Sequence, residues 1–100
     1  MRYSHRHYRI DEREDAGKEI RDYLVDVFEE WGFDDYRICE SGDIKIFTDE
    51  DFAIQWAFKL VKDYAKAHGY RCKYETVSGL MVFDDSKFNI FTLITNSNFG

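Results

Sequence analysis

Apolar residues recur three and four positions apart in two segments of the chain, which is the pattern of an amphipathic helix lying on a core. In the first segment these positions are Ala16, Ile20, Tyr23, Leu24, Val27, Phe28 and Trp31. In the second segment the corresponding positions are Ala53, Ala57, Leu60, Val61, Tyr64, Ala65 and His68. Each segment runs into a glycine, Gly32 or Gly69, where helices commonly end in a left-handed residue. The pattern predicts helices over about residues 12–31 and 49–68.

The two helical segments belong to an internal duplication with an offset of 37 residues. Its landmarks are Gly32-Phe33, aligned with Gly69-Tyr70, and Ser41-Gly42, aligned with Ser78-Gly79. Repeat one covers about residues 6–40, repeat two about 43–77, and residues 78–100 form a C-terminal strand extension. One hundred residues is a usual size for one hydrophobic core, so residues 1–100 are expected to form a single α+β domain.

Short runs of strand-forming residues fill the intervals. They predict strands over residues 36–40, 43–47, 71–77, 80–83 and 88–95. The last run is apolar on both faces, which favours a place inside the sheet. The duplication also aligns residues 7–10 with residues 44–47 and so predicts a short first strand.

The resulting order is β-α-β-β-α-β, and it resembles the ferredoxin-like fold over residues 7–77. Ser78-Gly79 would turn the strand over residues 71–77 into the one over residues 80–83, and residues 78–100 would add a C-terminal β-hairpin. Right-handed crossovers would place both helices on one face of an antiparallel sheet.

Composition narrows the class of protein. There is no run of about 18 apolar residues that would span a membrane, and residues 1–10 do not have the pattern of a secretory signal. The two cysteines, Cys39 and Cys72, lie far apart and fit no zinc or redox spacing. We therefore expect a cytoplasmic protein with reduced thiols and no membrane contact.

The net charge of −6 is unevenly distributed. Residues 11–51 contain sixteen acids and five bases, whereas residues 52–100 contain four acids and six bases. Non-specific binding to duplex DNA requires many cations that neutralise phosphates, so the chain is not expected to bind duplex DNA directly.

Motifs that carry chemistry are scarce. The sequence has no glycine-rich phosphate loop, no G-x-S-x-G and no H-E-x-x-H. On a strand, His5 and His7 would share one face, and zinc would then need two more ligands such as Cys39 or Cys72. No spacing supports that set, so we predict no metal, no cofactor and no catalytic residue. A small metal-binding protein or enzyme using His5 and His7 is the second alternative.

The first predicted helix carries a stripe of acids opposite its apolar positions. Its members are Asp15, Glu19, Asp22, Asp26 and Glu29, and Glu30 extends it. A solvated outer face is the ordinary explanation of such a run. However, like charges three and four residues apart destabilise a helix. Neighbouring carboxylates lie about 5–6 Å apart, close to the step between backbone phosphates, so the stripe is suited to imitate a nucleic acid.

These features predict a non-enzymatic protein-binding module or inhibitor, whose acidic helix docks on a basic partner of the nucleic-acid-binding class. In size, acidity, aromatic content and lack of catalytic motifs the chain is similar in character to small phage-encoded inhibitors such as anti-CRISPR proteins.

The alternative is a single-stranded nucleic-acid binder that uses the open face of the sheet. Strand alternation places cations and a ring there: Arg37, Lys45, Phe47, Arg71 and Lys73. Rings among cations stack single-stranded bases in small domains that resemble RNA-recognition modules. Residues 43–47 lack the glycine-aromatic run of those modules, and the C-terminal extension would bury the rings if it covered this face.

Phe52, Ile54 and Phe58 widen the apolar arc of the second helix. They would either be buried under the C-terminal segment or form an exposed patch for a homodimer.

Overall fold

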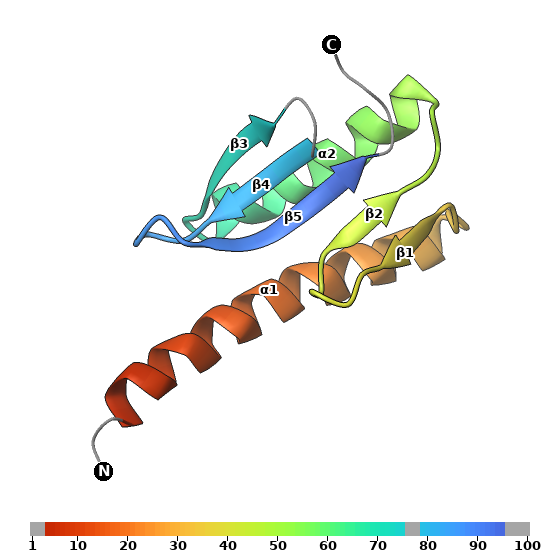
Figure 1. Ribbon diagram of the computed structural model, residues 1–100. Helices are drawn as coiled ribbons and strands as arrows, with labels where there is room; N and C mark the ends of the chain where they lie inside the picture. Colours follow the sequence, from red (N-terminus) through yellow and green to blue (C-terminus); the bar gives the residue numbers. More distant parts are fainter. Residues whose placement is uncertain (1–3, 76–78, 96–100) are drawn as a thin grey trace.

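Two helices and five strands make up the described part of the chain, residues 4–75 and 79–95, in the computed structural model (Figure 1). Of residues 4–14 only the backbone is described. The elements are α1 (Ser4–Glu30), β1 (Tyr36–Ile38), β2 (Ile44–Ile46), α2 (Asp51–Ala67), β3 (Arg71–Glu75), β4 (Gly79–Phe83) and β5 (Asn89–Thr95). The chain is thus a small α+β fold.

The five strands form one mixed sheet in the order β1-β2-β5-β4-β3. β2 and β5 are parallel, and the other three pairs are antiparallel, so the expectation of an antiparallel sheet was wrong. β5 lies at the centre, as its apolar residues on both faces predicted. β4 and β5 are therefore built into the sheet and are not a hairpin added to its outside (Figure 1).

The expected first strand, residues 7–10, was also wrong, because these residues belong to α1. Residues 4–16 contain no glycine or proline that would end a helix, and Arg and Glu are frequent among them. The expected strand rested on the alignment of residues 7–10 with residues 44–47. The two isoleucines and the phenylalanine of residues 44–47 favour a strand, whereas residues 7–10 have a different composition. Because the described chain begins with a helix, the ferredoxin-like topology is not confirmed.

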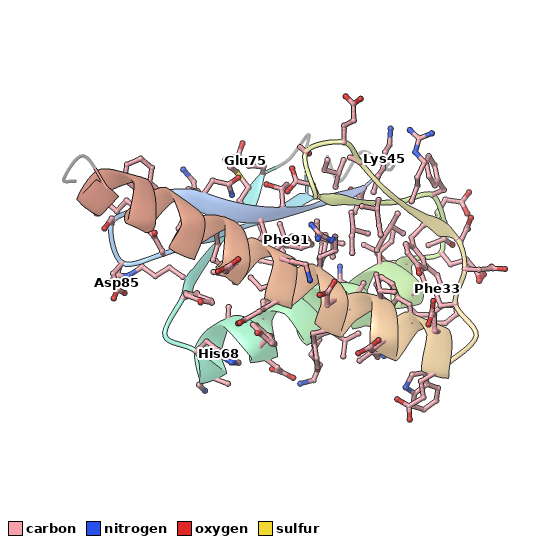
Figure 2. The ribbon with its side chains drawn as sticks, turned by 90° about the horizontal axis from the view of Figure 1, so that it is seen from below. Phe33, Lys45, His68, Glu75, Asp85 and Phe91 are labelled. Atoms are coloured by element: carbon pink, nitrogen blue, oxygen red, sulfur yellow. The ribbon has the colours of Figure 1, made fainter. Side chains whose placement is uncertain are left out.

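Both helices pack on the same face of the sheet, as predicted. The buried side chains are Ile20, Leu24 and Phe28 from α1, Ile54, Ala57, Phe58, Val61 and Ala65 from α2, and Ile44, Ile46, Leu80, Val82, Phe91 and Leu93 from the strands. Figure 2 shows Phe91 between the sheet and the helices, whereas Lys45 and Glu75 point away from them. Burial of each large side chain contributes about 1.5–3 kcal/mol, so this single layer stabilises the fold.

Both helices end at the predicted glycines. Gly32 and Gly69 have φ values of 72° and 78°, the left-handed region that glycine enters without a steric penalty. After α1, the Phe33 N–H donates to the Phe28 carbonyl oxygen at 2.8 Å. The rings of these two residues lie 5.0 Å apart, so the turn packs back on the core before β1 begins.

Gly17 marks the closest approach between α1 and the sheet. A Cβ atom at this position would meet the Ile90 carbonyl oxygen of β5. Gly17→Ala is therefore expected to lower the free energy of unfolding by about 1–3 kcal/mol, as overpacking does. Helix propensity alone predicts the opposite sign, a gain of about 1 kcal/mol. Urea denaturation decides between them, and a stabilised variant would show that α1 does not contact β5 here.

Candidate interaction surfaces

The acidic stripe lies on solvent-facing α1 positions. Asp15, Glu19, Asp22, Asp26, Glu29 and Glu30 are all exposed, and together they are called the acidic face below. The buried positions Ile20, Leu24 and Phe28 alternate with them along the same helix. The helical period thus separates the acids from the core, as the sequence predicted.

Few cations offset the acidic face. Lys18 Nζ and Asp22 Oδ2 form a salt bridge of 2.9 Å. Arg21 Nε also lies 4.0 Å from Asp22 Oδ1, and Arg21 Nη1 donates to the Gly42 carbonyl oxygen at 3.4 Å, toward the β1–β2 turn. Over residues 15–75 and 79–95, the other five members of the face form no salt bridge. Their carboxylates are therefore available to a partner.

The carboxyl end of α1 adds to this imbalance. Its last turn contains no base and includes Glu29 and Glu30. The carboxyl end of a helix carries a partial negative charge, and acids there are unfavourable by about 0.3–1 kcal/mol. The charges in the last turn of α1 therefore do not stabilise the helix.

The outer face of α2 has a different character. Lys59 forms a salt bridge with Asp63 at 2.9 Å. Lys62 Nζ donates to the Tyr74 hydroxyl oxygen at 2.6 Å and lies 5.2 Å from the centre of its ring. These two lysines are engaged within the protein, whereas Lys66, in the last turn of α2, is exposed.

The field of the acids extends to partly buried tyrosines. Burial raises the pKa of Tyr36, and Glu29 and Asp34 raise it further. Burial likewise raises the pKa of Tyr64 and Tyr70, and Glu19 is the next cause for both. Glu19 and Glu29 thus lie close enough to these tyrosines to disfavour their ionised forms, although burial is the larger cause.

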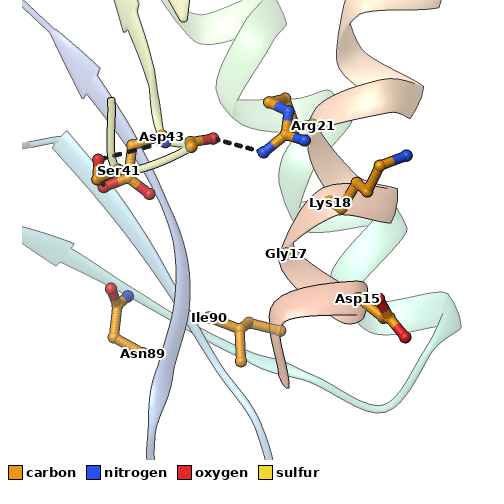
Figure 3. Close-up of a pocket in the computed structure, with 9 residues that line it drawn as sticks. Asp15, Gly17, Lys18, Arg21, Ser41, Asp43, Asn89 and Ile90 are labelled. Carbon is orange, nitrogen blue, oxygen red and sulfur yellow. Dashed lines mark hydrogen bonds between the residues drawn. The ribbon is translucent and has the colours of Figure 1, made fainter. Parts of the chain in front are cut away.

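A polar pocket of about 450 Å³ separates α1 from the β1–β2 turn and the start of β5 (Figure 3). Its lining residues include Asp15, Lys18, Arg21, Asp43 and Asn89. Three of the charged groups are already paired, because Asp43 Oδ1 accepts from the Thr92 N–H at 3.0 Å and the two cations bind as described above. Most of the charged groups that line the pocket are therefore bound within the protein, and few of them are available to a ligand.

An aromatic groove of about 630 Å³ lies where the end of α1 meets the start of α2. It is lined by Trp31, Gly32, Phe33, Asp35, Thr48, Glu50, Phe52, Ala53 and Trp56. Trp31 is 72% exposed and Phe52 is 73% exposed. The sequence pattern assigned Trp31 to the core, which was wrong. Trp31 lies beside Gly32, at the end of the helix, where only part of a helical turn remains to cover its ring. This position is the sequence signal that indicates an exposed Trp31.

The open face of the sheet holds the five residues of the alternative site in two groups. Arg37 is opposite Lys45 across β1 and β2, and both cations lie about 5.5 Å from the centre of the Phe47 ring. Lys73 and Arg71 lie on β3, at the other edge, opposite Met81 and Phe83 of β4. β5 and β4 separate the two groups, a distance of about 14 Å at the usual strand spacing. The described residues include no segment that covers this face.

The proposed homodimer patch is not one surface. Ile54 and Phe58 are 1% and 2% exposed and belong to the core, whereas Phe52 lies in the aromatic groove. The three side chains therefore cannot meet a second copy together.

His5 and His7 lie on a helix and not on the strand that the zinc hypothesis assumed. His5 and His7 lie in α1, where residues two apart do not share a face, so the strand argument for a common ligand geometry does not hold. Their side chains lie outside the described part of the chain. In the part that is described, no group of three or more His, Cys, Asp or Glu is placed to hold a metal ion.

Burial raises the pKa of the Cys72 thiol, which disfavours a reactive thiolate.

The fold and these surfaces define a small α+β protein with an acidic helical face and an exposed aromatic groove. No described helix is both long and apolar enough to cross a membrane. Comparison with models of known families, with curated proteins and with solved structures found no match. The function is therefore inferred from the surfaces described above.

Proposed function

We propose that this chain is a non-enzymatic protein-binding module whose acidic face docks on a basic partner. The supporting observation is that six exposed carboxylates, five of them without a salt bridge in residues 15–75 and 79–95, lie on one helix, and that the exposed Trp31 follows directly after its last residue. Unpaired charge attracts an oppositely charged surface, and exposed tryptophan is the residue type most enriched among binding hot spots.

The partner proposed is a nucleic-acid-binding protein of the cytoplasm. Carboxylates spaced three and four residues apart on a helix lie about 5–6 Å from one another, near the step between phosphates. A partner surface that binds phosphates would accept this row in their place. The module would then inhibit the partner, a role similar in character to that of small phage-encoded inhibitors.

A second candidate function is direct binding of single-stranded nucleic acid on the open sheet face. It is favoured by the Phe47 ring, which is 39% exposed between the cations Arg37 and Lys45. The separation of these residues from Arg71 and Lys73, and the net charge of −6, disfavour it.

One titration separates the two candidates. The fluorescence anisotropy of a short labelled single-stranded DNA or RNA is measured as the protein alone is added. In a second measurement the oligonucleotide is first bound to the basic partner, which is recovered by affinity capture, and the protein is then added to this complex. We expect no binding by the protein alone at micromolar concentration, and release of the oligonucleotide from the partner. Release should weaken as salt rises, because exposed charges are screened beyond about 10 Å at 0.1 M.

Micromolar or tighter binding of the oligonucleotide by the protein alone, lost in Phe47→Ala, would replace the first candidate with the second. Matched anisotropy of a duplex of the same sequence serves as the control for non-specific attraction.

A further inference from the structure

We propose that the aromatic groove receives an arginine side chain of the basic partner. This inference rests on the proposed function, because it names the group that anchors the partner beside the acidic face. The groove combines rings packed on the core, carboxylates without a salt bridge, and flanking segments that contain no lysine or arginine.

Three of the four rings that line the groove, those of Trp31, Phe33 and Trp56, are connected to the core below them. Trp56 lies 5.6 Å from Phe28, which is fully buried, and 5.8 Å from Phe33. Trp31 then meets Trp56 edge to face at 6.4 Å. The cluster therefore runs from a buried ring to an exposed one, and little side-chain order has to be created on binding.

Two carboxylates line the same groove. Glu50 is the N-cap residue of α2, but its side chain makes no capping hydrogen bond. Asp35 accepts the Phe47 N–H through its backbone carbonyl oxygen at 2.9 Å. Within residues 15–75 and 79–95 neither side chain forms a salt bridge, so both are available to a cation in the groove.

The flanking sequence supplies acids and no base. Residues 22–36 contain six acids and residues 47–58 contain three, and neither segment contains a lysine or arginine. The Asp49, Glu50 and Asp51 run also offsets the partial positive charge at the start of α2. An anionic ligand is thus repelled. A cationic ligand does not have to displace a lysine or arginine of these two segments from the carboxylates.

Arginine fits this chemistry better than lysine does. Its guanidinium is planar, stacks on aromatic faces and donates two parallel hydrogen bonds to a carboxylate. The lysine ammonium is a more strongly hydrated point charge, which loses more on entering a groove lined by rings. Rings and carboxylates together therefore select a guanidinium.

The test uses an acetylated and amidated peptide in which arginine alternates with glycine, together with the same peptide carrying lysine or the neutral citrulline. The chain contains two tryptophans, Trp31 and Trp56, and both line the groove, so intrinsic emission reports on this site. We expect the arginine peptide to change the emission and to bind about tenfold tighter than the lysine peptide. The citrulline peptide should not bind.

Variants locate the binding. Phe52→Ala and the double variant Asp35→Asn, Glu50→Gln should each weaken arginine-peptide binding about tenfold, measured by isothermal titration calorimetry. Phe88→Ala is the matched control, because Phe88 is a half-exposed ring in the β4–β5 connection. That connection, at Asp85, lies at the opposite end of the molecule from Phe33 of the groove (Figure 2).

The outcomes separate this inference from the proposed function. Equal affinity for arginine and lysine peptides, unaffected by Phe52→Ala but lost on charge reversal of the acidic face, would overturn the groove site and leave the proposed function standing. Arginine-selective binding that survives that reversal, with partner capture also intact, would keep the groove and overturn the role of the acidic face. Unchanged tryptophan emission at saturating arginine peptide overturns the groove site outright.

Discussion

Replacing Phe28 by alanine is expected to lower the free energy of unfolding by about 3–5 kcal/mol. Phe28 is 0% exposed, and its ring lies 5.0 Å from both Phe33 and Tyr36 and 5.6 Å from Trp56. Truncation leaves a cavity where α1, the segment before β1, and α2 meet. Domains of this size are stable by only about 5–15 kcal/mol, so the loss is a large part of the total.

Chemical denaturation followed by circular dichroism measures this effect. The matched control is Phe52→Ala, which removes the same ring from a side chain that is 73% exposed and should change stability by less than about 0.5 kcal/mol. A cost below about 1 kcal/mol for Phe28→Ala would show that the ring cluster is not packed as described. The aromatic groove should also loosen in this variant, because Trp56 loses its contact with a buried ring.

Reversal of Asp22, Asp26 and Glu29 to lysine should weaken partner binding at least about a hundredfold, or about 2.7 kcal/mol. Three attractive contacts become repulsive, whereas the fold is retained because all three positions are exposed. Partner affinity is measured by calorimetry at low and high salt. The difference between wild type and variant should shrink as salt rises.

A matched variant controls for the change in net charge. Glu40, Asp63 and Asp85 are also exposed but lie off α1, and their reversal to lysine takes the net charge from −6 to zero, just as the first variant does. Only the α1 reversal should release the partner. Equal losses in the two variants would mean that total charge, and not the acidic face, attracts the partner.

Features of the fold that depend on local chemistry were predictable. The glycines that end each helix and the alternation within each strand are encoded by neighbouring residues. The parallel pairing of β2 with β5 was not predictable, because it joins residues 44–46 to residues 93–95, which are far apart in the sequence and share no local pattern. Residues 7–10 are helical because their own composition, and not that of the aligned residues 44–47, determines their structure.

The candidate surfaces divide in the same way. The acidic face follows from helical periodicity alone, and each of its residues proved exposed. The aromatic groove depends on the end of α1 meeting the start of α2, about twenty residues later, which no local pattern reports. Trp31 has core spacing, but at the end of a helix spacing no longer determines burial.

The central position of β5 has a consequence for biosynthesis. The β1–β2 pair and the β3–β4 pair touch in the sheet only through β5, so a nascent chain that has not yet extended through residue 95 holds two hairpins that cannot join. Each hairpin then presents an unpaired inner edge, at β2 and at β4, of the kind that templates aggregation. Joining of the two hairpins into one sheet must therefore wait until β5 has been translated.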